Sequence, residues 1–446
     1  MKVISHLSVI LLVLTACSSV CLGQWTATNL SEAKVQMGAT SLGSKAYFGG
    51  GLGAFNHTKV VDIYDASTGE WTTDELSVAR SFHAAVSAGS KVFFAGGLKF
   101  DALENLTTVD IFDTLTQSWT VAQLSSPRMY DQAVSYENTV LFTGGYRVLS
   151  LSPTNFEFSD IVDIYDLTSE TWSTANLSQA RSGVAASVVG DVALFGGGQT
   201  STTEVSDRVD IYNFSTGTWT TASLSEARFF CTAVTIGQKV LFAGGTNADN
   251  EQSSTVDIYD HSTGEWSTSH LSAARSFTTK AVSACGLAFF PPGAILDLPT
   301  FLTTGAVNIV DIYDGINDTW TSYTLSIDKI NNATAAVDNQ ILIAGGTTSS
   351  GILTDRVDIY TCEVVNKTDE ALLPAQKVKL WPNPFEQKVT ISIDERSGAA
   401  FRVQLFDLSG RLLYSAAGNG EVSLTLDHLS PGTYLAKILT DEWAAT

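Results

Sequence analysis

Residues 108–122 read Thr-Val-Asp-Ile-Phe-Asp-Thr-Leu-Thr-Gln-Ser-Trp-Thr-Val-Ala. In residues 109–112 the side chains alternate, so that Val109 and Ile111 point to one face of a strand while Asp110 and Phe112 point to the other. Turn residues follow, and a second short strand carries Trp119. The stretch therefore predicts two short strands joined by a tight turn.

The same pattern returns along the chain, and this repetition decides the fold. From Asp62 to Asp358 six steps cover 296 residues, a pitch of about 49 residues that is typical of stacked repeats. A pair of glycines precedes most copies, but the sixth has Pro291 and Pro292 instead. The aspartates are Asp62, Asp110, Asp163, Asp210, Asp257, Asp311 and Asp358, and the tryptophans are Trp25, Trp71, Trp119, Trp172, Trp219, Trp266 and Trp320.

Each unit contains four strand-like runs, which in the second unit are residues 81–87, 91–95, 108–113 and 118–122. The paired glycines permit a tight turn where a Cβ atom would collide. One four-stranded sheet cannot cover both of its faces, but sheets stacked around an axis cover one another with Trp and aliphatic side chains. The repeat therefore predicts an all-β propeller.

The order of basic residue, Gly-Gly, Val-Asp-Ile-Tyr-Asp and Trp resembles the kelch repeat over residues 24–362. The resemblance implies a seven-bladed kelch-type β-propeller. Trp25 has no unit before it, and the seventh unit, which ends at Tyr360, has no Trp after it. We therefore expect residues 24–30 to supply the outer strand of the seventh blade and to close the ring.

Residues 1–23 have the pattern of an export signal. Met1-Lys2 is a small basic start, and residues 7–16 are nearly all apolar but too few to span a bilayer. Cleavage after Gly23 is the favoured interpretation, and a lipoprotein-like signal with lipid on Cys17 is the alternative. No later stretch has the roughly 18 uninterrupted apolar residues of a membrane helix, so we expect no transmembrane span in the mature chain.

A second domain follows the repeats. Residues 363–376 form a polar linker, and six strand-like runs come after it. They predict a small immunoglobulin-like β-sandwich over residues 377–446, with Ser409-Gly410 as one hairpin turn. The runs are residues 377–381, 388–394, 401–407, 411–416, 422–427 and 433–439.

Three motifs in this domain resemble the C-terminal sorting domain of type IX secretion cargo in Bacteroidetes: Leu-Trp-Pro-Asn-Pro at 380–384, Phe-Asp-Leu-Ser-Gly-Arg at 406–411 and Leu-Ser-Pro-Gly-Thr-Tyr at 429–434. The resemblance implies handling by the type IX secretion machinery, a secreted or outer cell surface location, and removal of the domain there. Such domains usually close with a basic strand, whereas residues 441–446 read Asp-Glu-Trp-Ala-Ala-Thr, so we expect a shortened or impaired signal. An ordinary appended β-sandwich is the alternative.

Charge and cysteine content narrow the possible partners. With 25 Lys and Arg against 46 Asp and Glu, the formal charge of -21 repels phosphate backbones and argues against nucleic acid as a partner. After residue 23 only Cys231, Cys285 and Cys362 remain. Their wide spacing predicts buried thiols or at most one disulfide, and no zinc site.

Residues that resemble catalytic groups recur in nearly every unit, which indicates a turn or hydrogen-bonding role rather than one acid–base pair. The basic series is expected to pair with the repeated carboxylates, and the kelch resemblance leaves ligand contact as an alternative. No metal-ligand spacing, nucleophile elbow or phosphate-binding loop occurs, so we predict no cofactor, no metal and no catalytic residue. Besides the seven repeat aspartates, these series are Asp65, Asp113, Asp166, Asp260 and Asp314, and Lys34, Arg80, Arg128, Arg181, Arg228, Arg275 and Lys329.

Binding residues are predicted where the units differ. Two positions after the basic residue, four units carry an aromatic residue: Phe82, Tyr130, Phe230 and Phe277. If these positions begin the innermost strands, the rings surround one mouth of the central channel and stack on sugars or on peptide aromatics. Packing between blades is the alternative.

The connections also differ in length. Trp-to-Trp distances of 53 and 54 residues place the largest insertions at residues 146–160 and 291–308, in the third and sixth blades. Variable loops on one propeller face commonly form the binding face, which makes Tyr146, Arg147 and Phe156 candidate binding residues. Neutral variation in loop length is the alternative.

Together these features predict an exported, non-catalytic binding module for an extracellular protein or glycan. A carbohydrate-processing enzyme on the same scaffold is the alternative, because a fold does not decide function. A compact cluster of unlike polar residues from several blades at one channel mouth would favour the enzyme, and the sequence reveals none.

Overall fold

Short strands joined by turns make up the described chain. The computed structural model describes residues 8–13, 24–99, 103–129, 132–151, 154–277, 279–297, 302–362, 378–381, 388–393, 400–406, 412–419, 421–425 and 433–440. Within these residues it contains strands and no α-helix, so no described helix is long and apolar enough to cross a membrane. The chain divides into two compact units, Gly23–Cys362 and the combination of Met1–Leu22 with Glu363–Thr446.

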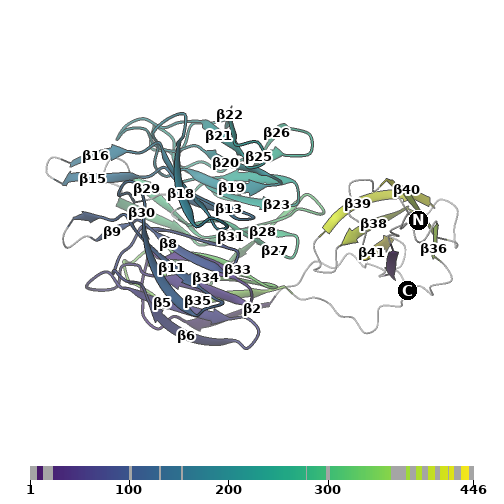
Figure 1. Ribbon diagram of the computed structural model, residues 1–446, viewed down its shortest axis with the longest axis horizontal. Helices are drawn as coiled ribbons and strands as arrows, with labels where there is room; N and C mark the ends of the chain where they lie inside the picture. The colour runs from purple at the N-terminus through teal and green to yellow at the C-terminus, as the bar shows by residue number, and fades with distance from the viewer. Residues whose placement is uncertain are drawn as a thin grey trace. The chain divides into compact units, whose positions relative to one another are not determined.

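Seven four-stranded antiparallel sheets form the first unit, which confirms the predicted seven-bladed propeller (Figure 1). The innermost strands of neighbouring blades pack side by side around a central channel. From the channel outward, the first three blades are β3 (Gly38–Leu42), β4 (Lys45–Gly49), β5 (Val60–Asp65), β6 (Glu70–Glu75); β7 (Ala84–Ala88), β8 (Lys91–Ala95), β11 (Thr108–Asp113), β12 (Ser118–Gln123); and β13 (Gln132–Tyr136), β14 (Thr139–Thr143), β17 (Ile161–Asp166), β18 (Thr171–Asn176).

The fourth to sixth blades repeat this order. Each presents its innermost strand to the channel and its Trp-bearing strand to the outside. They are β19 (Ala185–Val189), β20 (Val192–Gly196), β21 (Arg208–Asn213), β22 (Thr218–Ser223); β23 (Thr232–Ile236), β24 (Lys239–Ala243), β25 (Thr255–Asp260), β26 (Glu265–His270); and β27 (Val282–Ala284), β28 (Leu287–Phe290), β31 (Ile309–Asp314), β32 (Thr319–Thr324).

The seventh blade takes its outer strand from the N-terminal end of the propeller, as predicted. β2 (Gln24–Asn29) pairs antiparallel with β35 (Arg356–Thr361), which places Trp25 opposite Tyr360. The ring of Trp25 also stacks on Tyr323 of the sixth blade, with 4.8 Å between ring centroids. The other two strands of this blade are β33 (Ala333–Val337) and β34 (Gln340–Ala344).

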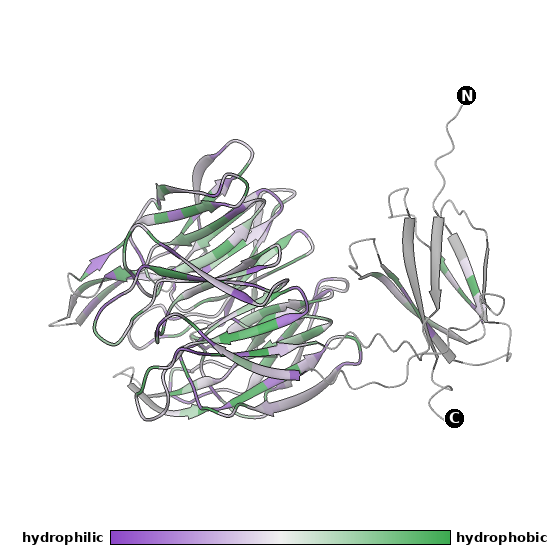
Figure 2. Ribbon diagram, turned by 90° about the horizontal axis from the view of Figure 1, so that it is seen from below, coloured by the Kyte–Doolittle hydropathy of each residue, from purple (hydrophilic) through white to green (hydrophobic). Residues whose placement is uncertain are grey.

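The hydrophobic core lies between the blades, because every sheet is covered on both faces. In β11, Val109 and Ile111 pack toward the third blade while Phe112 packs toward the first, as the alternation predicts. The middle strands of the blades are accordingly hydrophobic over much of their length (Figure 2). One disulfide, between Cys285 and Cys362, links the sixth blade to the end of β35, and Cys231 is a free, buried thiol.

The second unit is a small β domain that contains the six predicted strands. The sheet order is β1-β41-β38-β39-β40-β37-β36. β1 (Ser8–Val13), which belongs to the predicted export signal, pairs in parallel with β41 (Thr433–Thr440). The Ser409-Gly410 turn and residues 441–446 lie outside the described residues. The other strands are β36 (Val378–Trp381), β37 (Lys388–Ile393), β38 (Ala400–Phe406), β39 (Leu412–Asn419) and β40 (Glu421–Thr425).

Candidate functional site

Every blade contains one buried ion pair between the basic series and the repeat aspartates. In the third blade Arg128 Nη2 lies 2.6 Å from Asp163 Oδ2, and both side chains are almost fully buried. The predicted pairing is confirmed, and burial keeps these cations away from any ligand. The other pairs are Lys34 with Asp62, Arg80 with Asp110, Arg181 with Asp210, Arg228 with Asp257, Arg275 with Asp311, and Lys329 with Asp358.

These pairs hold the connections between blades. In the second blade, Asp110 Oδ1, the carboxylate oxygen that is not paired with Arg80, accepts a hydrogen bond from the amide of Ser77 at 3.1 Å. The backbone carbonyl of Arg80 accepts a hydrogen bond from the amide of Gly51 in the preceding blade at 2.8 Å. A Cβ atom at Gly50 would lie 2.6 Å from that same carbonyl, and the φ of this residue is 61°, so only glycine fits. The repeated polar residues are therefore structural.

The predicted mouth residues that the structure describes precede the innermost strands. Backbone hydrogen bonds join them to the equivalent positions in neighbouring blades. The amide of Phe82 donates to the carbonyl of Gln36 at 3.1 Å, and that of Phe277 donates to Phe230 at 2.7 Å. Phe82 and Phe230 adopt φ values of 57° and 50°, which are uncommon for bulky residues. Phe230 is 9% exposed and Phe277 only 2%, so little of either ring is open to a sugar. Tyr130 lies outside the described residues.

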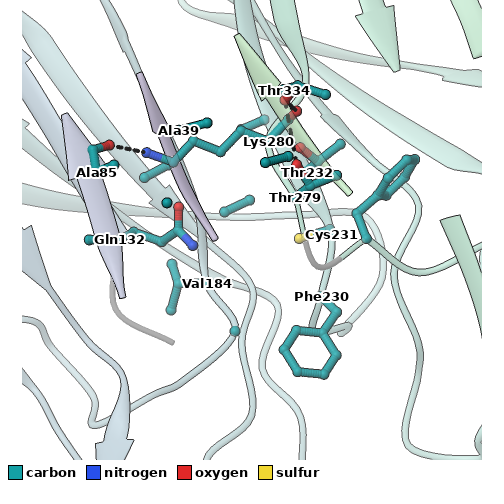
Figure 3. Close-up of a pocket in the computed structure, with 18 of the residues that line it drawn as sticks. Ala39, Ala85, Gln132, Val184, Phe230, Cys231, Thr232, Thr279, Lys280 and Thr334 are labelled. Atoms are coloured by element: carbon teal, nitrogen blue, oxygen red, sulfur yellow. Dashed lines mark hydrogen bonds between the residues drawn. The ribbon is translucent and has the colours of Figure 1, made fainter. Parts of the chain in front are cut away.

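A cavity of about 100 Å³ lies in the channel beside Phe230 and Phe277 (Figure 3). Lys280, from the sixth blade, extends across it, and its ammonium group donates to the carbonyls of Ala85 at 3.4 Å and Ala133 at 3.0 Å. The volume accommodates several water molecules, since one needs roughly 10–15 Å³. It is small compared with the roughly 300 Å³ or more of a typical organic ligand site.

Sequence reasoning missed the polar cluster of this cavity, which comprises Gln132, Thr232, Thr279, Lys280 and Thr334. These unlike residues come from four blades, so the structure contains a cluster of the kind that the sequence did not reveal. Comparing one position across all units would have found two of its members, Lys280 and Thr334. Five positions after the basic residue, the units carry Ala39, Ala85, Ala133, Ala186, Ala233, Lys280 and Thr334.

The titratable residues that line the cavity are His83, Cys231 and Lys280. Burial, together with the nearby Arg80, holds the pKa of His83 well below its usual value, and burial raises the pKa of the Cys231 thiol. The described residues that line the cavity include no Asp or Glu. At neutral pH the titratable groups that line the cavity are therefore neutral His83, the protonated Cys231 thiol and Lys280.

Three hairpins stand on one face of the propeller, at the connections between the second and third strands (Figure 1). We call this the hairpin face. The hairpins of the third and sixth blades occupy the two longest connections. They are β9 (Leu98–Lys99) with β10 (Glu104–Asn105), β15 (Tyr146–Leu151) with β16 (Thr154–Phe158), and β29 (Gly293–Asp297) with β30 (Leu302–Val307).

The third-blade hairpin packs against the channel mouth and the neighbouring hairpin. Phe82, Tyr146 and Phe156 gather in one apolar cluster with Val148, and the rings of Tyr146 and Phe156 lie 4.9 Å apart. The side chain of Asn105 donates to the carbonyl of Val148 and accepts from its amide, each at 2.9 Å. Two hairpins are thus fixed to one another and to a mouth residue.

Arg147 is the exposed member of the predicted hairpin residues. About 39% of its side chain is accessible, and its Nε donates to Glu157 Oε2 at 2.6 Å across the hairpin. Phe230 belongs instead to a cluster with Ala294 and Ala306 of the sixth-blade hairpin. Phe277 packs in a third cluster, in the core between the fifth and sixth blades.

The fold and its repeated ion pairs define a kelch-type β-propeller joined to a small β domain. The family model described as the Attractin/LZTR1 beta-propeller matches residues 46–283, more than half of the chain, and the chain belongs to this family. The model of the Secretion system C-terminal sorting domain matches residues 379–446, which indicates export and attachment to or secretion from the cell surface. A comparison with curated proteins found no significant match.

Proposed function

We propose that the propeller is a non-catalytic binding module that contacts an extracellular protein or glycan through its hairpin face. The arrangement of the third-blade hairpin carries this proposal. Its base is packed on Phe82 and bonded to Asn105, while Arg147 and Leu149 remain accessible. Loops held in place by a rigid scaffold are where proteins commonly carry binding residues.

The test compares two faces of the same molecule. The full chain is offered to a phage-displayed library of random peptides and to a glycan array, beside an Arg147→Ala/Leu149→Ser variant. We expect saturable binding to one ligand class that falls at least about tenfold in this variant, as for a truncated interface anchor.

The control variant is Leu115→Ser/Ile316→Ser. These exposed residues occupy turns between third and fourth strands, at the opposite ends of the strands from the hairpins. The control is expected to bind normally. Equal losses in both variants, or no binding by the full chain, would contradict the proposal.

The polar cluster of the cavity favours a second candidate, a carbohydrate-processing enzyme. Glycoside hydrolysis generally uses two carboxylic acids, and none lies among the described lining residues. Turnover of polysaccharides by the full chain that disappears in Lys280→Met would establish the enzyme. Turnover unaffected by this change would have to arise outside the cluster.

Export through the sorting domain gives a separate test of how the module reaches its partner. Deleting residues 379–446 is expected to leave the propeller inside the cell, because the matched domain is then absent. Protease treatment of intact cells followed by immunoblotting measures exposure. A deleted chain that is digested as readily as the full chain would contradict the role of this domain.

A further inference from the structure

In six blades the same backbone hydrogen bond joins the two ends of the connection between the second and third strands, so this bond can define comparable first and last residues. In each, the amide of the last residue donates to the carbonyl of the second glycine of the pair. In the first blade Thr58 donates to Gly51, and in the seventh Thr354 donates to Gly346, both at 3.0 Å. The other four bonds join Leu106 to Gly97, Ser159 to Gly145, Ser206 to Gly198 and Ser253 to Gly245.

Within these limits, two connections carry no Asp, Glu, Lys or Arg: residues 51–58 in the first blade, which Lys59 follows, and residues 346–354 in the seventh, which Asp355 follows. The absence is unusual in a chain with 46 acidic residues. Each of the other four connections has at least one charged residue, and the sixth-blade hairpin has Asp297. The charged residues are Lys99, Asp101 and Glu104; Arg147 and Glu157; Glu204; and Asp249 and Glu251.

The two uncharged connections are neighbours in the ring. The amide of Gly346 donates to the carbonyl of Lys34 at 3.1 Å, and the amide of Leu52 donates to the carbonyl of Val35 at 2.9 Å. Both connections are therefore hydrogen-bonded to the same pair of consecutive residues, Lys34 and Val35. We call residues 51–58 and 346–354 together the uncharged arc.

Large apolar side chains project from the uncharged arc into solvent. Phe55 is 95% exposed and Ile352 is 65% exposed, more than Leu149 at 48% or Ile295 at 37%, the other exposed large apolar residues described on this face. Ile295 belongs to the sixth blade, next to the seventh. Exposed large apolar side chains thus occur on three consecutive blades.

We propose that the uncharged arc docks a protein partner through an uncharged segment rich in apolar side chains. This inference rests on the proposed binding function and adds the surface and the class of partner. Interface centres are depleted in charge, as the arc is, and Phe55 belongs to the aromatic residues that are enriched there. Branched Ile352 offers no flat face for stacking on a sugar, so a protein fits better than a glycan.

The test uses the full chain and a Phe55→Ser/Ile352→Ser variant against the same peptide library. Peptides selected on the full chain are expected to be apolar and poor in charge. Their affinity, measured by biolayer interferometry, should fall at least about tenfold in the variant. The Leu115→Ser/Ile316→Ser control, which removes exposed apolar side chains from the opposite face, should bind as the full chain does. Equal melting temperatures establish that both variants fold.

Each other outcome overturns the inference in a distinguishable way. If selected peptides lose affinity in Arg147→Ala/Leu149→Ser but not in the arc variant, the third-blade hairpin binds and the arc does not. If the arc variant loses binding only on a neutral glycan array, the partner class is wrong. If charged peptides are selected, the arc is not a docking surface of this kind. If neither the library nor the array yields a ligand, both the arc proposal and the proposed function fail.

Discussion

The amide of Gly346 donates a hydrogen bond to the carbonyl of Lys34 at 3.1 Å, joining the last blade of the propeller to the first. The same bond joins Gly51 to Arg80 between the first and second blades at 2.8 Å. The ring is therefore closed by the interaction that the repeat uses at five of its six other junctions. Closure also depends on β2, whose six residues pair with β35.

Removing residues 24–30 is expected to destabilise the whole propeller. The deletion removes the pairing with β35 and the contacts of the Trp25 ring with Tyr323 and Tyr360, at 4.8 and 5.2 Å. β35 would then become an exposed edge strand, and the seventh blade would have three strands. Calorimetry measures the melting temperature, and an unchanged value would refute this account of closure. Trp25→Ala alone should give a smaller decrease.

Breaking one buried ion pair is expected to cost about 3–5 kcal/mol, because an uncompensated charge stays buried. In Arg181→Met the carboxylate of Asp210 loses its partner at a site where both side chains are at most 2% exposed. Urea unfolding measures the change. Arg181→Met/Asp210→Leu should recover part of the loss, because the double change leaves no buried charge. A double variant less stable than Arg181→Met would contradict this explanation.

The features that could be predicted from sequence are those that recur. Period, alternation and the unmatched Trp25 predicted the blades and their closure, because each depends on backbone pairing that is the same in every unit. The cavity could not be predicted in this way, because the ammonium group of Lys280 donates to backbone carbonyls of two other blades, and no pattern within one unit indicates these contacts. The exposure of Phe230 and Phe277 likewise depends on packing between blades, which a single strand does not encode.

The sixth blade illustrates the same limit. Pro292 has no N–H group and cannot make the bond that the second glycine makes elsewhere. The side chain of Asn332 donates instead to the carbonyls of Pro292 and Lys329, each at 3.4 Å. The loss of the glycines is visible in the sequence, but its replacement is visible only in the structure.

The disulfide between Cys285 and Cys362 is expected to stabilise the propeller by about 4 kcal/mol, the value for a loop of this length when the unfolded chain is constrained. The bond spans 77 residues and fixes the end of β35 to the sixth blade. Cys285→Ala/Cys362→Ala should therefore melt at a lower temperature. Adding a reductant should lower the melting temperature of the parent chain and leave that of the variant unchanged. A parent chain insensitive to complete reduction would contradict this contribution.

Acid should destabilise the propeller through the turns between third and fourth strands. In the first blade Asp65 Oδ1 accepts a hydrogen bond from the amide of Ser67 at 3.0 Å. Hydrogen bonds from Ser67 and Lys45 hold the pKa of Asp65 below its ordinary value of 3.8, and bonds from Ser262 lower that of Asp260. A carboxyl group with a lowered pKa in the folded state stabilises it above the unfolded value, and this stabilisation is lost as the pH falls through the folded value.

The fourth blade supplies the control for this prediction, because Asn213 occupies the equivalent position and does not titrate. Its side-chain oxygen accepts from the amide of Thr216 at 2.8 Å, so an amide can hold the turn. We expect the melting temperature of the parent chain to decline as the pH is lowered from about 4 toward 2, in the window set by the ordinary and lowered pKa values. A variant with asparagine at the four of the five acidic positions in these turns whose carboxyl pKa is lowered should show a shallower decline at a similar neutral-pH melting temperature. Identical slopes for the two proteins would mean that other carboxylates, such as those of the buried ion pairs, govern acid unfolding. The substitutions are Asp65→Asn, Asp113→Asn, Asp166→Asn and Asp260→Asn.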